Sequence, residues 1–118
     1  MTSKHILMGH LGSDADIVTL ANGKRKARLS VADSEGWRDA EGQWQERTHW
    51  HSVVTFQPGL VDYLEKHATK GRLVYVEGAI RSRRYRKDGE ETDRTETETI
   101  VGPRDTISFP TNDKRQEG

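Results

Sequence analysis

Aromatic and cationic side chains recur together along this chain of 118 residues. The groups are Trp37 with Arg38, Trp50 with Phe56, and Arg81 and Arg83 with Tyr85. Residues two apart in a strand point to the same side, so the last two groups would each share one strand face. Every nucleic-acid base has a π-face, so aromatic rings stack on bases without discriminating between them, and Arg and Lys neutralise phosphates. The pattern predicts sequence-independent binding of a single-stranded nucleic acid.

Taken singly, Trp50, Phe56 and Tyr85 are better explained as core residues, because large aromatic side chains are mostly buried. Trp37 and Trp44 resist that interpretation. They lie in a stretch dominated by Arg, Asp, Glu, Gln and Gly, with no apolar pattern around them. Exposed tryptophans indicate a binding surface.

The charge balance is zero, with 19 basic and 19 acidic residues, but the signs are segregated. Five of the seven residues from Arg81 to Lys87 and four of the five from Lys24 to Arg28 are basic, whereas acids gather between Asp88 and Glu98. Local fields steer ligands even where the sum is zero. Arg81, Arg83 and Arg84 lie within an expected strand beside an aromatic ring, which favours function over a merely solvated face.

Nothing in the sequence indicates an enzyme or a metalloprotein. His49 and His51 could offer two imidazoles, but a closed zinc site takes four ligands and the chain has no cysteine. No serine lies in a recognisable catalytic context, and no cofactor is expected. Without cysteines, a signal segment or an apolar run of membrane-spanning length, we expect a soluble cytoplasmic protein.

The hydrophobic periodicity predicts an all-β domain with one helix. Strands are expected at residues 6–11, 17–20, 26–32, 48–56, 72–85, 95–101 and 106–109, and a helix at 58–70. Residues 33–47 would form a protruding hairpin. Three strands, a helix and further strands is the order of the five-stranded OB-fold barrel. We assign residues 1–110 to this domain and residues 111–118 to a short, polar, disordered tail.

The chain resembles the bacterial single-stranded DNA-binding protein family. The matching stretches are ILMGHLGSD at residues 6–14, Asn22-Gly23, EGWRD at 35–39, THWHSVVTF at 48–56, Lys70-Gly71, VYVEG at 74–78 and Arg81-Ser82-Arg83. They arrive in family order over residues 3–109. The resemblance implies an OB-fold homotetramer that binds and protects single-stranded DNA in DNA replication, recombination and repair.

The resemblance also implies roles for individual residues. The stacking rings map to Trp37, Trp50, Phe56 and Tyr85, the last of which is often Trp in the family. The phosphate contacts map to Arg38, Lys70, Arg81, Arg83, Arg84 and Lys4. His51 matches a family histidine at the subunit interface. The resemblance assigns no role to Trp44.

Family members usually continue into a flexible linker and an acidic tip that recruits other genome-maintenance proteins. The chain has neither, so we do not expect it to recruit those partners. It is either a short phage- or plasmid-type member or a truncated one.

Two other interpretations stay open. An OB-fold relative could serve replication restart, although such proteins are expected to lack most of these rings, or could bind RNA by the same contacts. Alternatively, Trp37 and Trp44 could dock a protein partner, in which case binding would be insensitive to salt and to oligonucleotides.

Overall fold

The computed structural model describes residues 3–86 and 88–111. Lys87 lies outside the described residues, and so do residues 112–118, which make up most of the expected tail. The elements are β1 (His5–Leu11), β2 (Asp16–Thr19), β3 (Arg25–Arg38), β4 (Trp44–Thr55), α1 (Pro58–His67), β5 (Leu73–Tyr85), β6 (Arg94–Val101) and β7 (Thr106–Ser108). The expected helix and each expected strand are present, with shifted ends.

Five strands close into a barrel in the order β1-β3-β4-β6-β5, because β5 pairs back with β1. The β4–β6 pair is parallel and the others are antiparallel. The helix α1 lies between the third and fourth barrel strands in the chain, while β2 and β7 add to β3 and β5. This arrangement confirms the predicted OB-fold.

Alternation along the strands builds the core. Ala27, Leu29 and Val31 of β3 are buried, as the pattern of that segment predicts. From α1, Val61 and Leu64 are fully buried in the same cluster, so the helix covers the barrel with its apolar face. The barrel interior is therefore filled by side chains, and binding surfaces must lie outside it.

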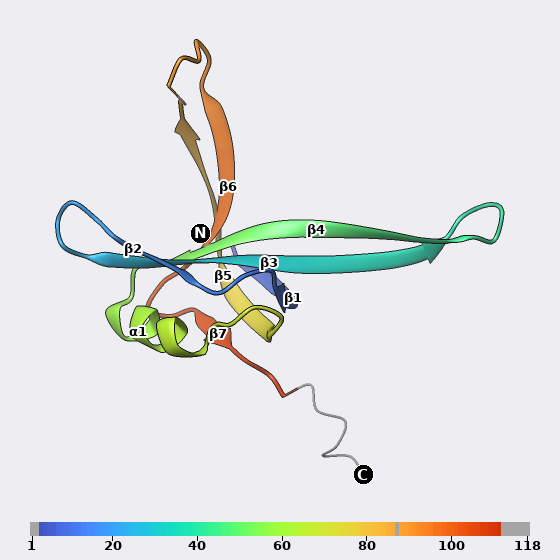
Figure 1. The fold of residues 1–118 in the computed structure, drawn as a ribbon, viewed down its shortest axis with the longest axis horizontal. Coiled ribbons are helices and arrows are strands. Elements are labelled where there is room, and N and C mark those ends of the chain that lie inside the picture. The colour runs from blue at the N-terminus through green and yellow to red at the C-terminus, as the bar shows by residue number, and fades with distance from the viewer. Residues whose placement is uncertain (1–2, 87, 112–118) are drawn as a thin grey trace.

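Two arms extend beyond the barrel in different directions (Figure 1). The β3–β4 arm comprises residues 33–38 and 44–49, and the β5–β6 arm comprises residues 81–85 and 94–98. They raise the radius of gyration to 16.8 Å, against about 13.5 Å for a compact domain of this length. The predicted protruding hairpin is confirmed, and its strands run further than expected because the ladder continues to the Arg38–Trp44 pair.

The helix ends three residues earlier than predicted. Pro58 occupies its first turn as expected, but Ala68 leaves the helical conformation with φ −84° and ψ 87°. Gly71 belongs instead to the following turn, where its φ of 87° suits glycine. Its N–H donates to the carbonyl of Leu11 at 2.8 Å. The turn thereby joins the end of the helix to the end of β1.

We predict that Gly9→Ala destabilises the barrel. A Cβ at Gly9 would lie 2.1 Å from the carbonyl oxygen of Ala32, so the two strand backbones would have to move apart. Overpacking of this kind costs about 1–3 kcal/mol. Urea unfolding at fixed protein concentration would measure the loss of stability.

The control is Gly59→Ala in α1, where a Cβ would meet no heavy atom within 4 Å. Alanine favours a helix, so this variant should match the wild type or exceed it by up to about 1 kcal/mol. Equal unfolding midpoints for the two variants would contradict the prediction.

Candidate nucleic-acid interface

Four strands contribute side chains to one outer surface, which spans the barrel and the adjoining β5–β6 arm. The ladder registers place Ser52 of β4, Glu98 of β6 and Arg81 of β5 in one row. Paired residues point to the same side of a sheet, and so do residues two apart in one strand. Trp50, two residues from Ser52, and Arg83, two residues from Arg81, therefore lie on this side too. We call this surface the Trp50 face. Its members are Arg28, Trp50, Ser52, Arg81, Arg83, Glu96 and Glu98.

The Trp50 ring is 61% exposed and lies directly against the backbone of Gly12. A Cβ at Gly12 would be 2.4 Å from the ring atom Cζ3, so a larger residue there would displace the ring from this position. The ring is thus supported on one side by the barrel and open to solvent elsewhere. A ring held in this way can stack on a planar ligand.

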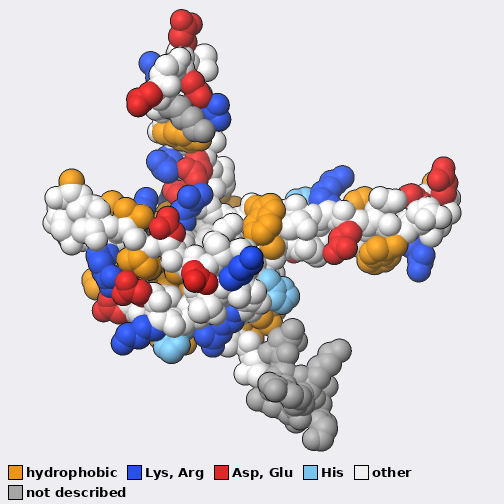
Figure 2. Space-filling model, viewed as in Figure 1, with side chains coloured by type: hydrophobic (Ala, Val, Ile, Leu, Met, Phe, Trp, Pro, Cys, Tyr) orange, Lys and Arg blue, Asp and Glu red, His pale blue; other side chains and the backbone are white. Residues whose placement is uncertain are grey.

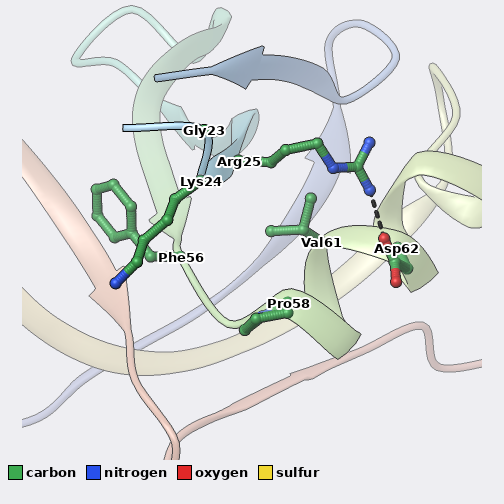
Figure 3. A pocket seen from close by; sticks show the side chains of 7 residues that line it. All are labelled: Gly23, Lys24, Arg25, Phe56, Pro58, Val61 and Asp62. Carbon is green, nitrogen blue, oxygen red and sulfur yellow. Dashed lines mark hydrogen bonds and ion pairs between the residues drawn. The ribbon is translucent and has the colours of Figure 1, made fainter. Parts of the chain in front are cut away.

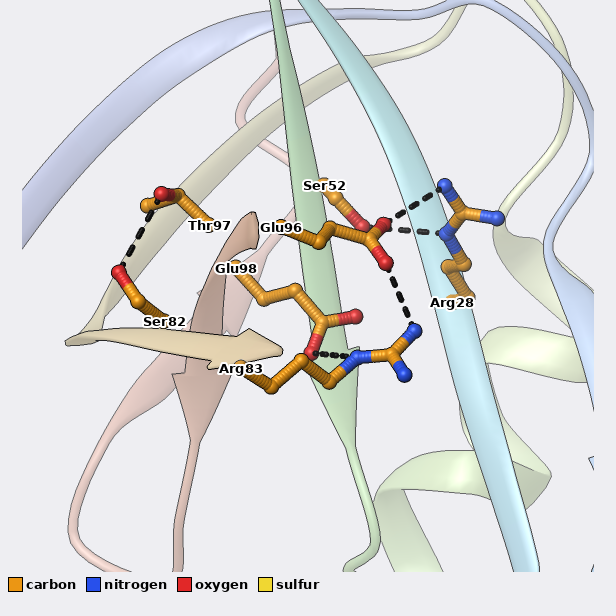
Figure 4. A network of polar contacts seen from close by, with 7 residues as sticks. All are labelled: Arg28, Ser52, Ser82, Arg83, Glu96, Thr97 and Glu98. Atoms are coloured by element: carbon orange, nitrogen blue, oxygen red, sulfur yellow. Dashed lines mark hydrogen bonds and ion pairs between the residues drawn. The ribbon is translucent and has the colours of Figure 1, made fainter. Parts of the chain in front are cut away.

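Ion pairs tie two arginines of the Trp50 face to carboxylates (Figure 4). Arg83 donates to Glu96 at 2.7 Å and forms an ion pair with Glu98 at 3.3 Å. Arg28 donates to Ser52 at 3.1 Å and reaches Glu96 at 3.4 Å. An incoming phosphate would have to compete with these carboxylates for Arg28 and Arg83.

The remaining cations predicted on β5 divide between its two faces. Arg81 lies on the Trp50 face and donates from Nη1 to the carbonyl of Ile80 at 2.8 Å. Arg84 pairs with Thr95 and points to the opposite side. The guanidinium carbon of Arg83 lies 5.6 Å from the Tyr85 ring centroid, so the structure brings Tyr85 beside this cation.

The register separates the tryptophans of the β3–β4 arm. Trp37 pairs with Gln45 and lies on the opposite side of the ribbon from Trp50, with the guanidinium carbon of Arg47 5.4 Å from its ring centroid. Trp44 pairs with Arg38, and this pair shares the side that carries Trp50. Figure 2 shows hydrophobic side chains among charged ones along this arm.

Phe56 lies beyond the end of β4, where it lines a pocket of about 360 Å³ with Lys24, Pro58 and Val61 (Figure 3). The ring is 46% exposed. Lys24, drawn beside the ring, forms no ion pair within the part of the chain that the structure describes. An exposed ring and a lysine therefore line the same pocket.

Arg25 at the same pocket is held by the helix. Glu65 accepts a hydrogen bond from it and raises the pKa of Arg25, and Asp62 adds to this effect. Arg25 is consequently committed to α1, and Lys24 is the freer cation of the pocket.

The two predicted lysine contacts have different surroundings. The ammonium of Lys4 is 3.1 Å from Glu77, which also accepts a hydrogen bond from the Tyr75 hydroxyl at 2.6 Å. Lys70 has an exposed side chain, and its backbone N–H donates to Asp14 at 2.9 Å. Lys70 therefore lies beside the segment that carries Gly12, the residue that contacts the Trp50 ring, whereas Lys4 is paired with Glu77.

His51 lies beside His5, with ring centroids 5.5 Å apart. Its Nε2 is 3.9 Å from Asp33 and forms no hydrogen bond with any described residue. The imidazole is therefore incompletely satisfied within one chain.

The sequence interpretation assigned no site role to Arg28, Glu96 or Gly12. Strand alternation could have found Arg28, because it opposes the buried side of Ala27 and Leu29. The contact between Gly12 and Trp50 joins residues far apart in the chain, and no local pattern signals it.

No helix within residues 3–86 and 88–111 is long and apolar enough to cross a membrane. Among the same residues, no three His, Asp or Glu side chains gather as metal ligands do.

Comparison with known proteins supplies a family. Residues 2–108 match the model of the Single-strand binding protein family. The Single-stranded DNA-binding proteins of Rickettsia felis and Rickettsia typhi are each 41% identical to the chain over 100 residues. These matches cover 84% of this chain and 65% of each relative, so the chain spans 65% of the length of these curated relatives.

Solved structures of single-stranded DNA-binding proteins also superpose on the chain. A Plasmodium falciparum SSB in complex with ssDNA superposes with a TM-score of 0.83 at 30% identity, covering 94% of this chain and 96% of that chain. A deletion mutant of the single-stranded DNA binding protein from Thermus aquaticus gives a TM-score of 0.73 at 23% identity, covering 94% and 51%. The second likeness bears on the fold alone.

The Lys4–Glu77–Tyr75 cluster generates a prediction about pH. The hydrogen bond from Tyr75 and then Lys4 lower the pKa of Glu77, and the same hydrogen bond raises the pKa of Tyr75. The carboxylate therefore contributes stability above its unfolded-state pKa, and this contribution disappears as the pH falls through the lowered value. Glu77→Gln removes the charge, so the pKa of Tyr75 should fall toward about 10.

A pH titration of tyrosinate absorbance would measure this change, and Tyr75→Phe would identify the contribution of that tyrosine. If the Tyr75 titration were the same in Glu77→Gln as in the wild type, the hydrogen bond would not control it.

Proposed function

The chain belongs to the Single-strand binding protein family, and from this premise we propose that it binds and protects single-stranded DNA without sequence preference. The observation that carries the proposal is the exposed Trp50 ring, held against Gly12 on a face that also carries Arg28, Arg81 and Arg83. Trp50 and Arg28 lie on barrel strands, and Arg81 and Arg83 lie on the adjoining β5–β6 arm, so one face offers both base stacking and phosphate neutralisation.

We further propose that the predicted rings and cations form this site. The stacking residues are Trp37, Trp50, Phe56 and Tyr85, and the phosphate contacts are Arg38, Lys70, Arg81, Arg83, Arg84 and Lys4. Their exposure supports the proposal, because Trp37, Trp50 and Phe56 are 38%, 61% and 46% exposed. The rings lie on several sides of the molecule, so a strand that contacts them all must wrap around it.

When DNA binds the Trp50 face, its phosphates would replace carboxylates as the partners of two arginines. Glu96 is paired with both Arg83 and Arg28. A phosphate that displaces the carboxylate keeps the arginine paired, but it leaves a negative side chain close to the DNA. Each of these arginines therefore contributes less to the free energy of DNA binding than an unpaired cation would.

We propose that the chain assembles as a homotetramer, with His51 at a subunit interface. Ile6 and Met8 of β1 support assembly, because they are 60% and 51% exposed although they are apolar. The unsatisfied Nε2 of His51 supports its role, because a second subunit could supply a partner. Light scattering of the purified protein tests the tetramer.

The proposal extends to the cell. Residues 1–110 would form the binding domain, and the protein would act in the cytoplasm in replication, recombination and repair. The activity is binding, which needs neither a cofactor nor a catalytic group.

The testing experiment is a titration of tryptophan fluorescence with oligo-dT, oligo-rU and duplex DNA at two salt concentrations. Stacking quenches the rings, so strong quenching by oligo-dT that weakens with salt is expected. Equal or stronger binding of oligo-rU would assign the site to RNA. If no nucleic acid quenched the rings, the proposal would fail, and docking of a protein partner would explain the exposed tryptophans.

Trp50→Ala should weaken oligo-dT binding by about 1–3 kcal/mol, because one stacked base loses its ring. The ring is exposed, so its removal should leave the core intact, and the circular dichroism spectrum and the oligomeric state should not change. Trp50→Phe keeps a π-face and should retain most of the affinity. Unchanged affinity in Trp50→Ala would remove this residue from the site.

Neutralising the arginines of the Trp50 face should flatten the dependence of affinity on salt. In Arg81→Gln and Arg83→Gln, the slope of log K against log salt should decrease by up to about 0.7 for each phosphate that is no longer neutralised. Glu96→Gln should strengthen binding, because it removes the carboxylate that competes for Arg28 and Arg83.

Arg104→Gln is the control for a change of charge alone, because Arg104 lies in the turn between β6 and β7. If Arg81→Gln and Arg83→Gln had the same slope as this control, these arginines would not contact phosphate.

A further inference from the structure

Trp44 is placed much as Trp50 is. The sequence marks it as an exposed ring on a binding surface, but the site described above gives it no role. It is 60% exposed, against 61% for Trp50. It is the first residue of β4, at the outer end of the β3–β4 arm, and it does not belong to the core cluster of the described residues. Burial in the core therefore does not explain this ring.

Both rings lie against a glycine of a neighbouring strand or turn. A Cβ at Gly36 would be 2.0 Å from the Cζ2 atom of Trp44, as a Cβ at Gly12 would be 2.4 Å from the Cζ3 atom of Trp50. Gly36 lies in the middle of the ladder and does not have a positive φ. Its lack of a side chain serves the approach of the ring.

The two rings belong to the same side of β4. Trp44 and Trp50 are six residues apart, and strand side chains alternate, so both point to the side that bears the Trp50 face. Six residues of strand span about 20 Å. A polymer that crosses Trp50 and continues outward along the arm would meet Trp44.

A cation accompanies the Trp44 ring. The guanidinium carbon of Arg38, its ladder partner, lies 6.0 Å from the ring centroid, and Arg38 donates to the carbonyl of Gly42 at 3.0 Å. Within the described residues Arg38 has no carboxylate partner, in contrast to Arg83. Its charge is available to a phosphate without competition.

Resting on the proposed function, we propose that Trp44 is a further base-stacking platform, which extends the single-stranded DNA site along the β3–β4 arm with Arg38 as its phosphate contact. The site then has two ring-and-cation units on one side of β4, one on the barrel and one on the arm. Only DNA long enough to reach both units gains from the second.

The test compares Trp44→Ala with Gln43→Ala, an exposed neutral neighbour on the same loop. Oligo-dT of about 4 and about 16 nucleotides, the limits of site size for one OB fold, serve as probes. On the long probe Trp44→Ala should lose between about fivefold and 150-fold in affinity, the equivalent of one stacked base. On the short probe the loss should be smaller, and Gln43→Ala should bind both probes like the wild type.

A second measurement reports on the ring itself. In the double variant Trp37→Phe, Trp50→Phe, Trp44 is the sole remaining tryptophan, and the long probe should quench its fluorescence. Adding Gly36→Ala displaces the ring from the backbone of β3 and should reduce the quenching. Trp44→Phe, which keeps a π-face, should recover affinity that Trp44→Ala loses.

The outcomes separate this proposal from the proposed function. If oligo-dT binds the wild type and Trp50→Ala weakens it, while Trp44→Ala equals Gln43→Ala and Trp44 is not quenched, then the Trp44 proposal alone is overturned. If oligo-dT does not bind the wild type, both proposals fall together.

Discussion

The pairing of β1 with two neighbours is the constraint on which the rest of the structure depends. β1 pairs with β3 on one edge and with β5 on the other, and this second ladder turns an open sheet into a barrel. At Gly9 the backbones of β1 and β3 approach so closely that a Cβ would meet a carbonyl oxygen, and Gly78 allows the same approach between β5 and β6. In the barrel β6 lies between β4 and β5, and the Trp50 face depends on that order.

Charge on this protein is organised by pairing more than by abundance. The sum is zero, yet Arg28 and Arg83 of the Trp50 face are paired with Glu96 and Glu98. Arg81 on that face and Arg38 on the β3–β4 arm have no carboxylate partner among the described residues. Exposed ion pairs contribute little to stability, so their main effect here is to determine which cations are available to bind a ligand. Steering by the local field therefore differs between the barrel and the arm.

Periodicity predicted most of the fold, because the buried residues of β3 and β5 alternate and α1 has helical spacing. The helix end was misplaced because Gly71 serves a turn bonded to Leu11, a contact distant in the chain. Strand parity also predicted that Arg81, Arg83 and Tyr85 share a face. It could not show that Trp37 and Trp50 lie on opposite sides of the ribbon, or that glycines support Trp44 and Trp50, because these depend on register across strands.

The β3–β4 arm has a thermodynamic consequence. Beyond the barrel its two strands pair only with each other among the described residues, and an isolated two-stranded ribbon is marginally stable in water. Amide protons of the arm should therefore exchange through local opening that leaves the barrel folded. A ligand bound on the arm must restrict these motions, and the resulting decrease in entropy offsets part of the contact energy. A ring on the arm thus contributes less affinity than an equal ring on the barrel.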